Sequence, residues 1–313
     1  MASLLKLPAV RSGAGISVIA PASFAQPERV DRGLKQLGQS RTLGFVPHLG
    51  QYALERGPLF FAGTTEQRLA DLHAAFADEN TSAVMCLRGG YGSNYLLRGL
   101  DLELIRKHPK PFFAYSDLTG IQLRLLDRLG LPAFHGPMVA VDFYLDDGVH
   151  LASFQAALTG EPYSVGPAEG LRVLKPGRAR GTLYGGCLSI LVSLLGTPYE
   201  PQTEGKLLFL EDTGAKPYQI DRMLWQLRQA GKLDGVRGIV FGEMLDCASP
   251  GVPPALLEEA ILRAFEDFDG PIAFGLRSGH VSRANVTLTF GVEAELCTAN
   301  DPELHLLEPA VTP

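Results

Sequence analysis

The sequence predicts an α/β fold in two parts: a mostly parallel N-terminal sheet flanked by helices, and a smaller C-terminal domain that is mixed α/β or barrel-like. The first reason is that short β-rich runs alternate with helical patterns in the first half of the chain. The second is that strand-like runs dominate after residue 180, with helical patterns interspersed. The third is that 313 residues with 46% hydrophobic content can bury a large core, and this length suggests about two domains.

The first half of the chain provides the expected parallel sheet. Strands are expected at residues 15–21, 83–87 and 110–115, and helices at residues 28–37, 65–77 and 117–130. Ligands of such sheets lie at the carboxyl ends of the strands. We therefore expect Ser116, and the loop that starts at Arg88, to lie at the ligand-binding edge.

The middle of the chain marks the expected boundary between the domains. Residues 142–180 contain Gly, Pro and Asp and show little periodicity, which is typical of a crossing between domains. The predicted division is an N-terminal domain over 1–150, a linker over 151–179 and a C-terminal domain over 180–313. In the last of these, strands are expected at 206–210, 238–241, 272–274 and 286–296, and helices at 219–230 and 254–265.

Composition excludes several classes of partner. The net charge of −6 and the lack of a basic run argue against binding to nucleic acid or to an anionic membrane surface. The N-terminus lacks the apolar core of a signal peptide and no run of about twenty apolar residues occurs, so a cytoplasmic location is predicted. The four cysteines are widely spaced and have no metal-ligand pattern, so neither a disulfide scaffold nor a zinc site is indicated, and buried free thiols are expected. No cofactor is predicted.

Ser116 is the most informative single residue. It ends the apolar run 110–115 and precedes a helical pattern, so its hydroxyl is expected at a strand-to-helix elbow near the positive end of the helix dipole. A serine placed there can act as a nucleophile. The alternative is an ordinary helix N-cap, because serine is a preferred capping residue and Asp117 suits a first helical turn. The residues around Ser116 leave both interpretations open.

Three other segments bear on chemistry. The apolar run 206–210 leads into Glu211 and Asp212, which places a carboxylate at a strand end, although such a pair also occurs in ordinary turns. His280 lies in a polar loop, where an isolated histidine is usually a surface residue. The glycine-rich loop after Arg88 could hold an anion with its backbone N–H groups, but it lacks the lysine and the spacing of a phosphate loop.

Taken in order, these segments resemble the L,D-carboxypeptidases of peptidase family S66. The resemblance covers nearly the whole chain. It rests on the motifs Arg88-Gly-Gly-Tyr-Gly-Ser93, Ala114-Tyr-Ser-Asp-Leu-Thr119, His135-Gly-Pro-Met138, Leu210-Glu-Asp212 with Tyr218-Gln-Ile-Asp-Arg-Met-Leu224, and Ser278-Gly-His280. It implies a serine peptidase with a triad at Ser116, Glu211 and His280, a homodimer, and removal of the terminal D-Ala from a murein stem peptide with diaminopimelate or lysine at the L-centre.

The chemistry of these residue types agrees with the implied roles. His280 would take the serine proton as general base, and Glu211 would orient the imidazole. The oxyanion would be held by the backbone N–H of Asp117 and one from Gly89 or Gly90. An exopeptidase must also recognise a free carboxylate, for which Arg88 is the candidate, although a structural salt bridge is an equal alternative for that residue.

One departure and two alternatives qualify the resemblance. Cys187 stands where the family commonly has asparagine, so any supporting role of that segment is open; Cys187 is expected to be a small buried residue at a helix start. Within the family, some members instead cleave peptidyl nucleotides such as microcin C, using an additional aromatic loop that is short here. Outside it, a non-catalytic anion-binding module would use the same elbow and glycine loop.

Overall fold

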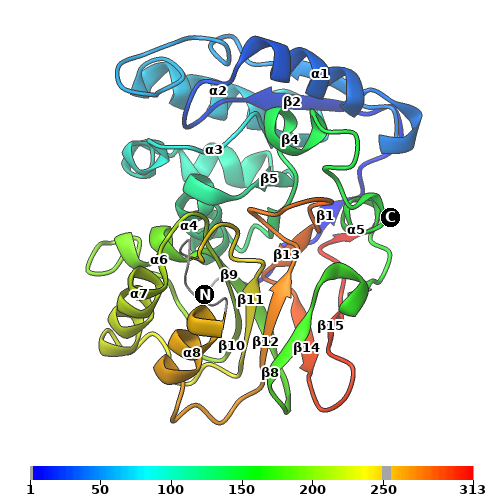
Figure 1. Cartoon of the computed structure of the whole chain (residues 1–313). Helices are drawn as coiled ribbons and strands as arrows, with labels where there is room; N and C mark the ends of the chain where they lie inside the picture. The colour runs from blue at the N-terminus through cyan, green and yellow to red at the C-terminus, as the bar shows by residue number, and fades with distance from the viewer. Residues whose placement is uncertain (1–2, 249–254, 313) are drawn as a thin grey trace. The chain divides into compact units, whose positions relative to one another are not determined.

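The computed structural model describes residues 3–248 and 255–312, and the chain divides into two compact units (Figure 1). Unit 1 consists of Met1–Pro162, Arg283–Gly291 and Pro309–Pro313. Unit 2 consists of Tyr163–Ser282 and Val292–Glu308. Each unit is thus assembled from segments that are separated in the sequence. Among the described residues, none of the helices is long and apolar enough to cross a membrane.

Unit 1 is built on a six-stranded sheet with the order β13-β6-β5-β4-β2-β3. Its strands are parallel except for the edge strand β13, which runs antiparallel to β6. The strands are β2 (Gly15–Ile19), β3 (Val46–Leu49), β4 (Ala83–Cys86), β5 (Phe112–Ala114), β6 (Ala133–His135) and β13 (Leu288–Phe290). All residues of β4 and β5 are buried, as expected for central strands of a parallel sheet.

Four helices lie between consecutive parallel strands of this sheet, and a fifth follows β6. They are α1 (Pro27–Leu37), α2 (Thr65–Ala77), α3 (Leu102–Lys107), α4 (Thr119–Leu129) and α5 (Leu151–Thr159). Strand β2 lies between β3 and β4, so the connections from the centre of the sheet leave in opposite directions. In such sheets the crevice at this switch point is the preferred ligand site. The loops after β2 and β4 form it here.

Local sequence explains where two of these helices begin and end. Helix α2 begins at a capping box, in which the Thr64 hydroxyl accepts the Gln67 N–H and the Gln67 side chain accepts the Thr64 N–H. Helix α4 ends at Gly130, whose φ of +69° is a left-handed conformation that glycine adopts readily. The chain ends of unit 1 pair in parallel, β1 (Leu7–Pro8) with β16 (Val311–Thr312).

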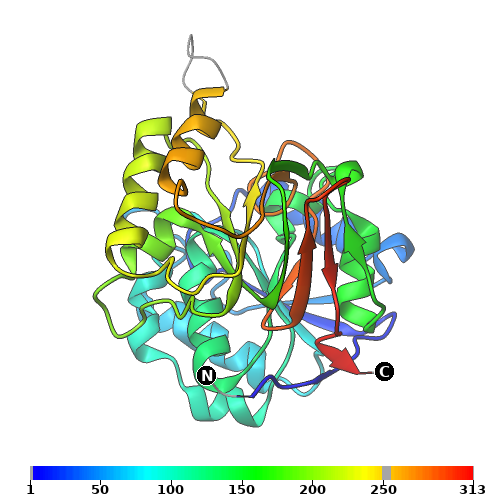
Figure 2. The same cartoon turned by 90° about the horizontal axis from the view of Figure 1, so that it is seen from below.

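Unit 2 contains an eight-stranded mixed sheet with the order β7-β15-β14-β9-β10-β11-β12-β8. Its centre, from β9 to β12, is parallel, and the flanking strands are antiparallel. The strands are β7 (Ser164–Val165), β8 (Arg172–Lys175), β9 (Arg178–Cys187), β10 (Lys206–Glu211), β11 (Gly238–Gly242), β12 (Ile272–Leu276), β14 (Glu293–Cys297) and β15 (Glu303–Leu306). Helices α6 (Leu188–Ser193), α7 (Pro217–Gln229) and α8 (Ala255–Ala264) contact one another in sequence, and both views show them on one side of the strands (Figure 2).

The fold class predicted from the sequence is confirmed, and the second unit is a mixed α/β sheet. The boundaries differ from the expected ones. Residues 151–179 are not a linker, because they contain α5, β7, β8 and the start of β9. The sequence pattern of these strands is weak because β7 and β8 are short and lie at the two edges of the sheet. Edge strands are less buried, so their apolar and polar residues need not alternate. The expected start of the last helix, at Pro254, lies outside the described residues.

The expected single strand over 286–296 is two strands that belong to different units. Strand β13 joins the sheet of unit 1, and β14 joins that of unit 2. Gly291 lies between them with a φ of +99°, and a Cβ there would come within 2.7 Å of the side chains of Leu4 and Leu126. The alternating apolar residues of this segment therefore give no sign of the turn at Gly291, whose conformation glycine adopts readily.

Candidate active site

Ser116 lies at a strained elbow between β5 and α4. Strand β5 ends at Ala114, and Ser116 opens a short 3₁₀ turn that continues directly into the helix. Its φ of +64° falls in the left-handed region, which is costly for a residue with a side chain. Ser116 is partly exposed although the residues on both sides of it are buried. Neither this turn nor α4 has a side-chain cap, so the geometry is that of a presented hydroxyl and not of an N-cap.

The glycine-rich loop after β4 lies against Ser116. A Cβ on Gly89 would come 2.9 Å from the Ser116 Cβ and 3.1 Å from its Oγ, closer than side-chain atoms pack. The same position would be 3.4 Å from the Asp117 backbone nitrogen. Only a glycine leaves this space open. The structure thus brings the predicted nucleophile beside Gly89 and Asp117, two of the residues predicted to supply oxyanion donors.

A buried network holds this loop in place. The Asp117 carboxylate accepts the Ser93 backbone N–H at 2.8 Å, and the Ser93 hydroxyl donates to the Asp117 carbonyl. Arg68 donates to the Gly92 carbonyl at 2.7 Å and to the Pro21 carbonyl at 3.2 Å. Burial raises the pKa of Asp117, and burial also lowers the pKa of Arg68. Together these groups join the loops after β2 and β4 to the nucleophile's turn.

This network was not predicted from the sequence, although the position of Arg68 indicates one of its residues. Arg68 is only 1% exposed and lies on the same helical face of α2 as the buried residues Leu72 and Ala75. Arginine is almost never fully buried unless it is paired. A cation on the apolar face of an amphipathic helix therefore indicates a specific partner, which here is the backbone of the glycine loop.

A pocket of about 360 Å³ opens beside the glycine loop. Gly90, with a φ of +106°, lines it, and a Cβ there would come within 2.4 Å of the Ser23 hydroxyl and 3.4 Å of the Arg88 Nη2. Phe24, Phe60 and Tyr91 are also part of its lining. The Arg88 guanidinium therefore lies beside Gly90, the residue that follows the glycine packed against Ser116.

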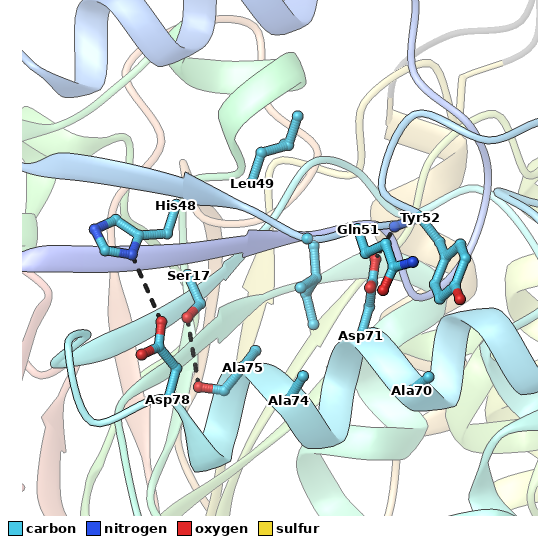
Figure 3. Close-up of a pocket in the computed structure, with 12 residues that line it drawn as sticks. Ser17, His48, Leu49, Gln51, Tyr52, Ala70, Asp71, Ala74, Ala75 and Asp78 are labelled. Atoms are coloured by element: carbon cyan, nitrogen blue, oxygen red, sulfur yellow. Dashed lines mark hydrogen bonds and ion pairs between the residues drawn. The ribbon is translucent and has the colours of Figure 1, made fainter.

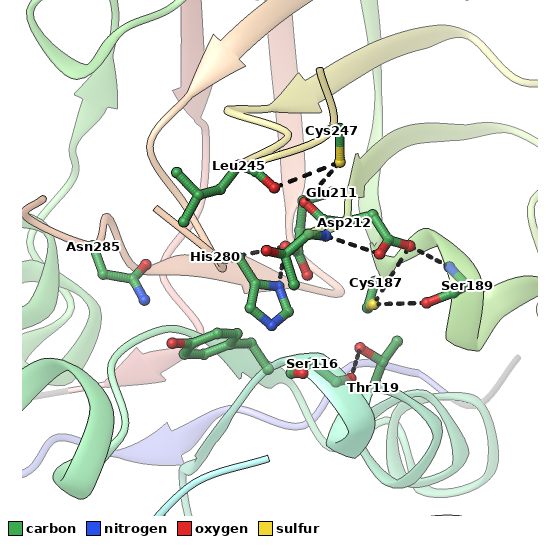
Figure 4. A network of polar contacts seen from close by, with 12 residues as sticks. Ser116, Thr119, Cys187, Ser189, Glu211, Asp212, Leu245, Cys247, His280 and Asn285 are labelled. Atoms are coloured by element: carbon green, nitrogen blue, oxygen red, sulfur yellow. Dashed lines mark hydrogen bonds and ion pairs between the residues drawn. The ribbon is translucent and has the colours of Figure 1, made fainter. Parts of the chain in front are cut away.

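The predicted carboxylate and imidazole meet in unit 2 (Figure 4). Glu211 is the last residue of β10 and is fully buried, whereas the His280 side chain is 21% exposed. Nδ1 of His280 lies 2.7 Å from Oε2 of Glu211, and the same oxygen accepts the His280 backbone N–H at 3.1 Å. The carboxylate therefore fixes both the ring and the loop that carries it.

Two glycines make room for the Glu211 side chain. A Cβ on Gly242 would lie 2.6 Å from the Glu211 Cβ, and a Cβ on Gly279 would lie 2.6 Å from the Glu211 Cδ. Gly279 also has a φ of +88°, which side chains rarely adopt. The order Ser278-Gly-His280 thus has a physical reason, since the glycine before the histidine lets the loop close over the carboxylate.

The segment in which this chain departs from the family pattern lies beside Glu211. The Asp212 carboxylate accepts the Ser189 backbone N–H at 2.8 Å, and the Cys187 Sγ lies 3.9 Å from it (Figure 4). Burial raises the pKa of Asp212, and it raises the pKa of the Cys187 thiol well above its ordinary value. Cys187 directly precedes α6 and is 4% exposed, as expected for a small buried residue.

A second pocket of unit 1, of about 400 Å³, lies between β3 and α2 (Figure 3). Its acidic side chains already have partners in the protein. His48 contacts Asp78 at 3.5 Å, and the Asp71 carboxylate accepts the Tyr52 backbone N–H at 2.9 Å. Within the described part of the chain, no group of three or more acidic, histidine or cysteine residues could hold a metal ion.

The predicted site residues therefore form two groups. Ser116, Asp117, Gly90 and Arg88 belong to unit 1, whereas Glu211 and His280 belong to unit 2. Within each unit the residues expected to cooperate lie close together. The meeting of the two groups in one triad stays a prediction.

Comparison with known proteins decides the family. Residues 16–136 match the model of the LD-carboxypeptidase N-terminal domain, and residues 180–296 match that of the LD-carboxypeptidase C-terminal domain. The chain belongs to the LD-carboxypeptidase family. The resemblance found in the sequence motifs is thereby confirmed, and membership indicates a peptidase.

Curated relatives of this chain carry names that agree with the family. A "probable murein peptide carboxypeptidase" of Bacillus subtilis is 40% identical over 296 residues, which cover 93% of this chain and 91% of that protein. A "murein tetrapeptide carboxypeptidase" of Pseudomonas aeruginosa is 35% identical over 283 residues, covering 85% of this chain and 87% of that protein.

The solved structures of similar fold include one titled a muramoyltetrapeptide carboxypeptidase and others titled MccF or MccF-like. A muramoyltetrapeptide carboxypeptidase from Oxalobacter formigenes superposes with a TM-score of 0.81 at 29% identity, covering 95% of this chain and all of that one. An MccF-like protein from Bacillus anthracis superposes with a TM-score of 0.88 at 28% identity, covering 97% of this chain and 99% of that one. The microcin C7 self-immunity protein MccF, at 22% identity, shares the fold.

Proposed function

We propose that this protein is a serine L,D-carboxypeptidase that removes the terminal D-alanine from murein tetrapeptides. The observation that carries the proposal is the strained, partly exposed Ser116 beside the open backbone of Gly89. The buried Glu211–His280 pair in the other unit provides the base that such a serine needs. The murein carboxypeptidase names of the relatives supply the substrate class.

The proposed acylation step uses all three side chains. The Ser116 Oγ attacks the carbonyl carbon of the peptide bond to the terminal D-residue, and its proton passes to His280. Because Nδ1 contacts Glu211, Nε2 is the atom that would accept this proton. Glu211 stabilises the imidazolium that results. The C–N bond then breaks, the imidazolium protonates the leaving amine, and free D-alanine departs.

Deacylation repeats the sequence with water as the nucleophile. His280 takes a proton from water, the resulting hydroxide attacks the ester carbonyl, and the proton returns to the Ser116 oxygen as the tripeptide leaves. In both steps the oxyanion would bind the backbone N–H of Asp117 and one from Gly89 or Gly90. The Arg68–Asp117 network supports the positions of these donors before substrate binds.

The proposed role of Arg88 is to bind the terminal carboxylate of the substrate. Its Nε is buried and has no hydrogen-bond partner within the described residues, and an arginine fork suits a carboxylate. Among the described residues, no acidic side chain belongs to the lining of the adjoining pocket. These observations favour ligand binding over the alternative of a structural salt bridge.

The test is release of D-alanine from L-Ala-γ-D-Glu-L-Lys-D-Ala and from its diaminopimelate counterpart, measured by amino-acid analysis. The wild type should release stoichiometric D-alanine from at least one, and Ser116→Ala should release none above background. An intact tetrapeptide after prolonged incubation with folded wild type would overturn the proposal and favour a non-catalytic anion-binding module. Cytoplasmic location and a homodimer complete the proposal; light scattering on the purified protein measures the latter.

Hydrolysis of peptidyl or aminoacyl nucleotides is the second candidate. It is favoured by the MccF-like neighbour from Bacillus anthracis at a TM-score of 0.88. In this chain Tyr218, 56% exposed, lies in the first turn of α7, and it is the aromatic residue that the segment between Glu211 and Ile220 offers for stacking on a base. Incubation with an aminoacyl sulfamoyl-adenosine, beside the tetrapeptide, separates the two functions. Faster cleavage of the nucleotide conjugate would favour the second.

A further inference from the structure

We propose that the pocket beside Arg88 binds the side chain of the leaving D-residue, and that the enzyme therefore releases D-residues with large apolar side chains as well as D-alanine. This inference rests on the proposed carboxypeptidase function. It concerns the width of the substrate class and uses only residues of unit 1.

The pocket beside Arg88 lies close to the nucleophile. Gly89 packs against the Ser116 hydroxyl, and Gly90, the next residue, lines the pocket. A Cβ on Gly90 would be 3.4 Å from the Arg88 Nη2. Adjacent Cα atoms are about 3.8 Å apart. The pocket therefore begins one residue along the chain from the glycine that lies against the nucleophile, a separation that a single leaving residue can span.

The pocket carries positive charge. Arg88 is in its lining, and Arg56 stacks over the ring of Phe24 at 4.6 Å from the ring centroid. Neither a carboxylate nor another anion of the described residues is part of the lining. The pocket thus favours the end of the substrate that carries a carboxylate. With that carboxylate on Arg88 and the scissile bond at Ser116, the α-carbon between them lies at the pocket.

The walls of the pocket are largely aromatic, and the pocket is larger than an alanine side chain needs. Phe24, Phe60 and Tyr91 line the pocket, and two of them are exposed, Phe60 by 65% and Tyr91 by 43%. The volume of about 360 Å³ falls in the range of roughly 300–1,000 Å³ that is typical of small-molecule sites. An alanine methyl group would leave most of these aromatic surfaces without contact. A methionine or phenylalanine side chain would cover them and gain the free energy of apolar burial.

One of the aromatic walls, Tyr91, is tied to the glycine loop by hydrogen bonds. The Tyr91 ring packs against Phe61 at 5.6 Å between centroids, and its backbone N–H donates to the Ser23 hydroxyl at 3.0 Å. Ser23 in turn donates its own N–H to the Gly89 carbonyl. Tyr91 and the glycine loop are therefore parts of one hydrogen-bonded assembly, so a side chain that binds against Tyr91 takes a defined position relative to Ser116.

The experiment compares stem tetrapeptides L-Ala-γ-D-Glu-L-Lys-D-X with X as Ala, Met or Phe. We expect kcat/KM for D-Met and D-Phe to exceed that for D-Ala by at least about tenfold, the lower end of the factor that one methylene group contributes in a hydrophobic pocket. Cleavage of D-Ala alone would overturn the pocket assignment and leave the proposed function intact. Cleavage of none of the three would overturn the proposed function itself.

Variants locate the effect. Phe60→Ala, at an exposed position, should lower the D-Phe to D-Ala ratio of kcat/KM by about fivefold to tenfold. Leu54→Ala is the matched control, since Leu54 is 57% exposed and is not part of this pocket, and its ratio should equal that of the wild type. An unchanged ratio in Phe60→Ala would contradict the inference.

Amidated substrates separate the two carboxylates that Arg88 could bind. Amidation of the terminal carboxyl should abolish the difference between wild type and Arg88→Met, whereas amidation of the α-carboxyl of γ-D-Glu should preserve it. The reverse result would place the acyl part of the substrate at Arg88 and overturn the assignment of the pocket to the leaving residue.

Discussion

The two units prepare their halves of the proposed site in different ways. Unit 1 presents the nucleophile by backbone geometry: a left-handed φ at Ser116, a glycine beside it, and a buried arginine that binds carbonyl groups. Unit 2 prepares the base by side-chain burial: a fully buried Glu211 that contacts both the ring and the backbone of His280. The serine hydroxyl is thus positioned by the backbone of a rigid turn, whereas the imidazole is positioned by a carboxylate that sets its tautomer.

The largest expected effect comes from removing either reacting group. Ser116→Ala and His280→Ala should each lower kcat by about 10⁴-fold to 10⁶-fold with the fold intact, because neither half of the site can act alone. Glu211→Gln should cost less, about 10³-fold to 10⁴-fold, since it orients and does not transfer the proton. Steady-state release of D-alanine measures the series, and circular dichroism checks the fold. Near-normal turnover in the serine variant would exclude Ser116 as nucleophile.

A single methyl group beside the nucleophile tests the backbone half of the comparison. Gly89→Ala should lower kcat by about 100-fold, since its Cβ would lie 2.9 Å from that of Ser116 and displace an oxyanion donor. Gly38→Ala is the matched control, because its φ is −76° and its Cβ would meet no atom closer than 3.5 Å. Equal activities of the two variants would show that the close approach of the loop has no catalytic role.

The buried carboxyl of Asp117 gives a pH test of the same half. Because burial raises the pKa of Asp117 above 3.8, the stability that this group contributes is present below pH 3.8 and is lost as pH rises through its folded pKa. The free energy of unfolding of the wild type, relative to that of Asp117→Asn, should therefore fall between pH 4 and pH 7. The fall is about 1.4 kcal/mol for every tenfold difference between the acid dissociation constants of this carboxyl in the folded and unfolded chain. Urea unfolding at several pH values measures it, and a constant difference would mean that Asp117 titrates as an exposed acid.

The smallest expected effect concerns the thiols near the base. Burial raises the pKa of Cys247 to about 11 and that of Cys187 well above its usual value, so both should stay protonated and unreactive at pH 8. Iodoacetamide should leave kcat within about twofold of the untreated enzyme. Rapid inactivation that Cys187→Ala prevents would instead give this departure from the family pattern a part in the site.

Sequence reasoning succeeded where local pattern and local structure coincide. The strand-to-helix step at Ser116, the helix over 65–77 and the carboxylate at the end of β10 follow from runs of neighbouring residues. The left-handed φ of Ser116 has no such signal, because serine does not favour it; the surrounding sheet and loop impose it. Residues 283–291 belong to unit 1 although they follow most of unit 2 in the sequence. This assignment depends on tertiary packing, so no local sequence pattern predicts it.

The most direct test of the central claim is a double-mutant cycle on Ser116→Ala and His280→Ala, with kcat/KM for D-alanine release measured for all four proteins. Residues that act as one catalytic group lose their effect together. The double variant is expected to be no slower than the slower single variant, although its two substitutions lie in different units. Losses that multiply in the double variant would show that the serine and the histidine act independently and would contradict the proposed triad.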